Sequence, residues 1–71
     1  MIAVQEVNEF ERLVVIEEMR RNGYGDYTMQ PGNGCVWVSV PRGGYSLEMY
    51  YIFRDGCLVD LQIDWDYEKT N

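Results

Sequence analysis

The residues with the most obvious chemical potential are four carboxylates near the C-terminal end, Asp60, Asp64, Asp66 and Glu68. Carboxylate oxygens are the ligands that calcium and magnesium prefer. The spacing does not match a calcium-binding loop, and a strand holds alternate side chains too far apart to converge on one ion. Paired carboxylates also hydrolyse glycosides, but that reaction needs a cleft that so short a chain rarely forms. The sequence therefore predicts no metal ion and no cofactor.

Nucleophilic catalysis is also disfavoured by the residue types present. Cys57 is the most plausible nucleophile, but the chain contains no histidine that could activate it. We expect Cys57 to be a small core residue and Cys35 to lie on the opposite face of a sheet, which disfavours a disulfide. The glycines at 32–34 and 43–44 are predicted to form hairpin turns, because neither a Gly-Lys-Ser/Thr sequence nor a helix start follows them. We therefore predict that the protein is not an enzyme.

Composition and charge limit the class of partner. The chain has 71 residues, of which 46 % are hydrophobic and 25 % are charged, so we expect one globular domain over residues 1–71. Twelve acidic residues against six basic ones give a net charge of −6, which repels phosphate and argues against direct binding of nucleic acid. No apolar run approaches the ~20 residues of a membrane-spanning helix. No secretory signal is visible, and two cysteines are typical of a reduced pair, so a cytoplasmic location is predicted.

Residues 8–22 are predicted to form a helix. Asn8 is a good N-cap, Glu11 completes a capping-box pattern, and Gly23 suits the left-handed residue that commonly closes a helix. The helix has two apolar clusters. The first, on one face, consists of Phe10, Leu13 and Val14. The second extends round the other side and consists of Val15, Ile16 and Met19.

The rest of the chain is predicted to form an antiparallel β-meander. Turn residues separate strands at 35–40, 45–53 and 57–65, and a possible edge strand lies at 26–29. The expected fold class is α+β, in which the N-terminal helix packs on one face of a three- to four-stranded meander.

The turn before Cys57 determines the register of the last hairpin. A two-residue turn at Asp55-Gly56 would pair Tyr51 with Asp60 and place core-like side chains beside carboxylates on one face. A three-residue loop over 54–56 instead pairs Tyr51 with Val59, and the same alignment pairs Met49 with Leu61, Leu47 with Ile63 and Tyr45 with Trp65. A one-residue slip exchanges the two faces of a strand, so burial favours the three-residue loop.

This register assigns a covered face and an open face to the sheet. On the open face, Trp37 lies opposite Tyr50 and Tyr50 opposite Asp60, which makes an aromatic and acidic row that suits a protein partner. Two alternatives remain: an ordinary solvated surface with cross-strand aromatic pairs, or a face covered by a second copy of the chain. The predicted core residues are Val36, Val38, Val40, Leu47, Met49, Tyr51, Phe53, Val59, Leu61, Ile63 and Trp65, with Cys57 at the edge; Leu58 is assigned to the open face.

In size, acidity and lack of catalytic groups, the chain resembles the small inhibitors that phages encode against host defences, of which the anti-CRISPR proteins are the best-known group. The resemblance lies in the whole-chain character and in the acidic stretch over residues 60–68. It implies stoichiometric inhibition, in which the protein occupies a basic nucleic-acid-binding surface of a CRISPR effector or locks a moving part of it. Carboxylates along a strand can meet the Arg and Lys residues that normally hold phosphate.

The sequence thus predicts an acidic, non-enzymatic protein that binds a basic protein partner, and the resemblance implies that this partner is a CRISPR effector subunit. One alternative is a structural protein that forms homo-oligomers through the open sheet face, and another is an immunity protein or antitoxin that neutralises a toxin. The residues predicted to contact the partner are Trp37, Glu48, Tyr50, Asp60, Asp64, Asp66 and Glu68.

Overall fold

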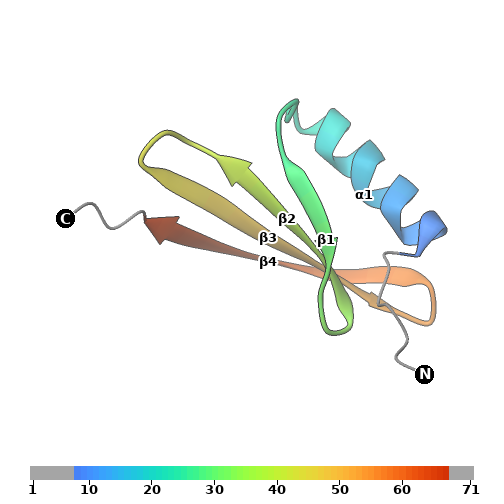
Figure 1. The fold of residues 1–71 in the computed structure, drawn as a ribbon. Coiled ribbons are helices and arrows are strands. Elements are labelled where there is room, and N and C mark those ends of the chain that lie inside the picture. The colour runs from blue at the N-terminus through green and yellow to red at the C-terminus, as the bar shows by residue number, and fades with distance from the viewer. Residues whose placement is uncertain (1–7, 68–71) are drawn as a thin grey trace, which may run out of the picture.

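The computed structural model describes residues 8–67, which form one helix followed by four strands (Figure 1). The strands lie in the order β1-β2-β3-β4 in a single antiparallel sheet, which confirms the expected α+β class and the meander. Among these residues, no helix has both the length and the apolar character needed to cross a membrane. The elements are α1 (Glu9–Arg21), β1 (Thr28–Pro31), β2 (Cys35–Pro41), β3 (Tyr45–Arg54) and β4 (Cys57–Tyr67).

The ends of α1 are capped as the sequence predicts. The side chain of Asn8 accepts hydrogen bonds from the backbone N–H groups of Phe10 (2.9 Å) and Glu11 (3.4 Å), which satisfies donors that have no partner within the helix. At the other end Gly23 has a φ of 81°, a conformation that costs glycine little because it has no Cβ. The helix ends at Arg21, one residue earlier than predicted.

The core lies between one face of α1 and one face of the sheet. Val15 and Met19 are fully buried, whereas Phe10 is 61 % exposed and Leu13 is 54 % exposed. Of the two apolar clusters on the helix, the second is therefore the one that packs against the sheet. Its partners come from β2 and β3, and the hydroxyl of Tyr51 lies 3.4 Å from the sulfur of Met19. The buried sheet residues are Val36, Val38, Val40, Leu47, Met49 and Tyr51.

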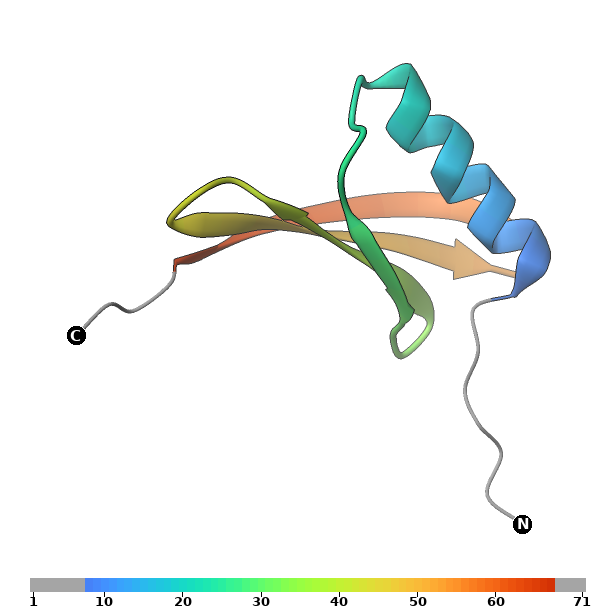
Figure 2. The same cartoon turned by 45° about the horizontal axis from the view of Figure 1, so that its top comes forward.

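The predicted core was too large for the helix that covers it. Thirteen residues make a helix about 20 Å long, whereas the ten and eleven residues of β3 and β4 extend over about 33 Å. The β2–β3 turn and the end of β4 therefore extend past the helix (Figures 1 and 2). The residues of β4 that were predicted to be core are exposed: Val59 52 %, Leu61 38 %, Ile63 54 % and Trp65 50 %.

The turn between β3 and β4 has two residues, so the predicted three-residue loop was wrong. Arg54 pairs with Cys57, and the turn between them consists of Asp55, with a φ of 52°, and Gly56, with a φ of 79°. Positive φ at both positions is typical of the tight turn whose twist matches that of the flanking strands. The β2–β3 hairpin has the predicted register, with Val40 opposite Leu47 and so on through the strand pair.

A β-bulge follows this turn, and it keeps the apolar residues of β4 on one face of the sheet and the aspartates on the other. Phe53 pairs with Leu58 and Ile52 with Asp60, so Val59 is an extra residue in β4. Beyond the bulge, Tyr51 pairs with Leu61 instead of the predicted Val59, which is a shift of two residues. Because side chains alternate with a period of two, this shift leaves Leu61, Ile63 and Trp65 on the predicted face.

Before the bulge the predicted faces are reversed. Leu58 was assigned to the open face, but it lies opposite Phe53 and packs against the core. Cys57 was expected to be a small core residue, but it is exposed. The shift also changes the predicted aromatic and acidic row, because Tyr50 lies opposite Gln62 and not opposite Asp60.

Candidate protein-binding surface

The open face of β4 carries the acidic row. Asp60, Asp64 and Asp66 are exposed, and they lie opposite Ile52, Glu48 and Ser46 of β3 respectively, on the side of the sheet away from α1. Gln62 lies between them in the same row, so the strand alternates its side chains as predicted. Glu68, the fourth predicted carboxylate, lies outside the described residues.

Glu48 does not join this exposed row, because its side chain is buried within the open face. The residue is only 6 % exposed. One carboxylate oxygen accepts a hydrogen bond from the indole nitrogen of Trp37 at 2.5 Å, and the other accepts from the hydroxyls of Ser39 (2.7 Å) and Ser46 (2.6 Å). Glu48 was predicted to contact a partner, but these bonds make it a residue that holds the sheet surface together.

The ionisation of Glu48 is favoured by the same three bonds. Burial by itself raises the pKa of a carboxyl group, because it disfavours the charged form. For Glu48, however, the hydrogen bonds from Ser46, Ser39 and Trp37 together outweigh burial and leave its pKa below the ordinary value of 4.5. The carboxylate is thus charged at neutral pH although it is nearly enclosed.

Trp37 and Tyr50 form the aromatic part of the open face. They are opposite each other in β2 and β3, and their rings stack with centroids 5.9 Å apart and planes 24° apart. Both are half-buried. Burial raises the pKa of Tyr50, and the charges of Glu48 and Asp64 raise it further, so the hydroxyl stays protonated and can donate a hydrogen bond. The predicted cross-strand pair is therefore present, and both side chains are partly exposed.

The helix side of β4 carries a second exposed row, which is apolar. Leu61, Ile63 and Trp65 continue the core face beyond the area that α1 covers, and the ring of Trp65 contacts that of Tyr45 at 5.2 Å between centroids. These three residues were predicted to lie in the core. The signal that could have located them at the surface is the number of core candidates, which exceeds what one helix of this length can cover.

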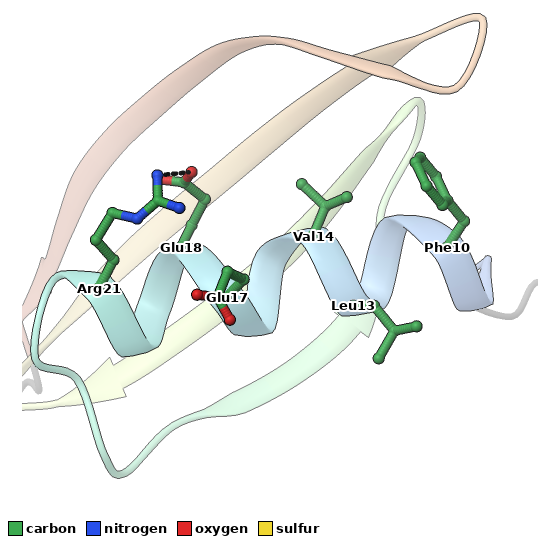
Figure 3. A pocket seen from close by; sticks show the side chains of 6 residues that line it. All are labelled: Phe10, Leu13, Val14, Glu17, Glu18 and Arg21. Atoms are coloured by element: carbon green, nitrogen blue, oxygen red, sulfur yellow. Dashed lines mark hydrogen bonds and ion pairs between the residues drawn. The ribbon is translucent and has the colours of Figure 1, made fainter.

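The exposed side of α1 carries a separate groove. The groove has a volume of about 380 Å³ and is lined by helix residues. Phe10, Val14 and Glu18 lie along one side of the helix, and the guanidinium of Arg21 contacts the carboxylate of Glu18 at 3.4 Å (Figure 3). Both α1 and β4 therefore present apolar side chains that no residue of 8–67 covers.

The structure brings the predicted contact residues together in part. Trp37, Tyr50 and Gln62 form one row across the sheet, and the next row contains Glu48 and Asp64. Asp60 and Asp66 lie towards opposite ends of β4. Across residues 8–67, no group of three or more cysteines and carboxylates is placed to hold a metal ion, and both cysteines are free.

No protein-family model, no curated protein and no solved structure matches this chain. Its function is therefore inferred from the placement and exposure of its side chains.

Proposed function

We propose that this protein is a non-enzymatic binding protein that docks through β4 on a basic surface of another protein. The observation that carries the proposal is the exposure of Asp60, Asp64 and Asp66 in one row of the edge strand, with the stacked rings of Trp37 and Tyr50 beside that row. Carboxylates in such a row can bind the Arg and Lys side chains of a phosphate-binding site, and complementary charge speeds the encounter.

The more specific form of the proposal is an inhibitor of the anti-CRISPR type. In this form the acidic row occupies a surface of a CRISPR effector that otherwise holds nucleic acid. The net charge of −6 supports this form, because a protein that carries it is attracted to the same surface as a phosphate backbone. The tyrosine and tryptophan of the open face would add the contact area that charge pairs exposed to water do not supply.

Affinity capture with charge-reversed variants tests the proposal. The partner is captured from a bacterial lysate by the wild-type protein and by the double variant Asp60→Lys, Asp64→Lys. We expect the reversed protein to lose the partner, and we expect rising salt to release the partner from the wild type, because salt screens exposed charge contacts. Partner retained at full yield by the reversed variant would refute the acidic row as the docking surface.

A second double variant, Glu17→Lys, Asp26→Lys, is the matched control. It changes the net charge by the same amount, and both residues are exposed and lie outside β4. Retention of the partner by this control would separate an effect of the acidic row from an effect of total charge. Both variants should remain folded, because surface substitutions usually change stability by less than about 0.5 kcal/mol.

Self-association is a second candidate function, and the exposed apolar row of β4 favours it. Leu61, Ile63 and Trp65 are 38 %, 54 % and 50 % exposed, and Phe10 on the helix is 61 % exposed. Such a surface can be covered by a second copy in a structural assembly. Light scattering over a range of concentrations distinguishes the two functions, because a strict monomer removes this candidate.

A further inference from the structure

Among residues 8–67, no strand pairs with the long outer edge of β4. The strand order leaves β1 and β4 at the two edges of the sheet, but β1 has only four residues and ends in a proline, whereas β4 has eleven residues. Proline and shortness protect β1 from pairing with another strand. β4 is protected only by the bulge at Val59 and by its aspartates. An edge of this length is a template for an additional strand.

The hydrogen-bonding pattern shows which backbone groups point outward from β4. The N–H of Arg42 donates to the carbonyl of Tyr45 at 2.9 Å, so Tyr45 and alternate residues after it face β2. Tyr50 therefore faces β4, and its partner Gln62 faces β3. Since alternate residues of β4 face opposite ways, the groups that point away from the sheet belong to Leu61, Ile63 and Trp65.

Two of these outward N–H groups are occupied by carboxylates. The N–H of Leu61 donates to the side chain of Asp60 at 2.8 Å, and the N–H of Trp65 donates to the side chain of Asp64 at 2.9 Å. A strand that pairs with this edge must displace both carboxylates. If the added strand has neutral side chains, the displaced carboxylates lose a hydrogen bond and gain no ion pair. If it has Lys or Arg opposite each aspartate, each carboxylate forms a new ion pair.

The side chains of Leu61, Ile63 and Trp65 determine which residue types the incoming strand needs on its helix-side face. Leu61, Ile63 and Trp65 lie on the helix side and are 38 %, 54 % and 50 % exposed. Apolar side chains on an added strand would lie next to them and bury surface that is now in contact with water. The edge thus requires apolar residues on one face of the incoming strand and basic residues on the other.

We propose that β4 binds its partner by strand addition, and that the partner contributes an extended segment in which basic and apolar residues alternate. The inference rests on the proposed function, because it specifies how the acidic row meets a basic protein. A second copy of β4 fits less well. Antiparallel pairing with full overlap of Leu61–Trp65 would place Asp60 opposite Asp66 of the other copy, and like charges directly opposite are destabilising.

Synthetic peptides test the proposal without knowledge of the natural partner. The probe is a fluorescent peptide about ten residues long in which Lys and Val alternate, and its binding is measured by fluorescence anisotropy. The first control has the same composition with the lysines and valines in separate blocks. The second control is the alternating peptide with N-methyl groups on the backbone nitrogens that would face β4. We expect each control to bind at least about tenfold more weakly, which corresponds to ~1.4 kcal/mol.

A proline in β4 provides the matching test on the protein. Ile63→Pro removes an outward N–H without removing a hydrogen bond to β3, so the fold tolerates it better than a proline elsewhere in β4. We expect Ile63→Pro to weaken binding of the alternating peptide by about tenfold or more, and Ile63→Thr, which keeps the N–H, to weaken it by less than about threefold. Circular dichroism shows whether each variant is folded, and the N-methylated peptide gives an answer with wild-type protein if Ile63→Pro is not.

The outcomes separate this inference from the proposed function. Equal binding of the alternating, block and N-methylated peptides, with affinity that falls as salt rises, would overturn strand addition and leave docking by charge intact. Failure of every lysine peptide to bind would overturn strand addition, and capture of the partner with the Asp60→Lys, Asp64→Lys variant then decides the proposed function separately. Tight binding of an alternating peptide of Glu and Val would contradict the requirement for basic residues.

Discussion

The indole nitrogen of Trp37 donates a hydrogen bond of 2.5 Å to Glu48, across the β2–β3 pair on the open face of the sheet. Glu48 is a charged residue on the sheet face opposite α1, yet it is 6 % exposed. The bond fixes the orientation of the Trp37 ring, which in turn stacks on Tyr50. The buried carboxylate therefore determines the shape of the surface that we propose as the docking site.

Replacement of Glu48 should destabilise the protein. Glu48→Ala leaves the indole of Trp37 and the hydroxyls of Ser39 and Ser46 without their shared acceptor. We expect the free energy of unfolding in urea to fall by about 2–3 kcal/mol, and by about half as much for Glu48→Gln, which keeps one acceptor oxygen. Asp66→Asn is the control and should change stability by less than about 0.5 kcal/mol. An unchanged unfolding midpoint for Glu48→Ala would show that these bonds contribute nothing.

The same carboxylate should contribute to the loss of stability in acid. Because the pKa of Glu48 is lower in the folded protein than its ordinary value of 4.5, the unfolded chain binds the proton more readily. The stabilisation by Glu48 is thus fully present above about pH 5 and is lost as pH falls through the lower folded pKa. We expect urea unfolding of Glu48→Gln to show a weaker dependence on pH below about pH 5 than that of the wild type. Parallel pH profiles for the two proteins would contradict the assignment.

Deletion of Val59 should be tolerated, because this residue is the insertion that forms the β-bulge. Without it, Leu58 still pairs with Phe53 and Asp60 with Ile52, so no later side chain changes face. We expect a loss of less than about 1 kcal/mol in unfolding free energy. Deletion of Gln62 is the control, and it should cost several times more.

The larger effect of the control has a structural cause. Without Gln62, either Asp60 moves to the helix side next to Tyr51 or every later residue of β4 changes face. The two deletions remove one residue each from the same strand, so a comparison of their unfolding curves isolates the effect of register. Equal destabilisation by both deletions would show that the bulge does not separate the two parts of β4.

Local features of the fold followed from the sequence because they depend on neighbouring residues. The helix cap at Asn8 and its closure at Gly23 are decided within a few positions of the chain. The register of the β2–β3 hairpin was predicted for the same reason, since the Gly43-Gly44 turn and the alternation of its strands agree. The alternation of Asp60, Gln62 and Asp64 with apolar residues also placed the acidic row on one face of β4.

The pairing of β3 with β4 could not be predicted from the local sequence. The expected burial of apolar residues correctly excluded a two-residue turn at Asp55-Gly56 followed by a regular ladder, because that ladder would place apolar residues and carboxylates on the same face of the sheet. A three-residue loop and a two-residue turn with a bulge both restore the faces, and alternation alone cannot distinguish them. The structure has the bulge at Val59, so every pair beyond it is shifted by two residues from the prediction.

The sequence by itself determined the class of fold, the capped helix and the separation of acidic and apolar residues along β4, because these properties follow from local conformation and from a period of two. Only the tertiary structure decided which of these residues meet water. It buries Glu48, which accepts a hydrogen bond from Trp37, and leaves Ile63 and Trp65 54 % and 50 % exposed. The physical reason is that exposure depends on the area one helix can cover and on contacts between strands, neither of which is a property of any single segment.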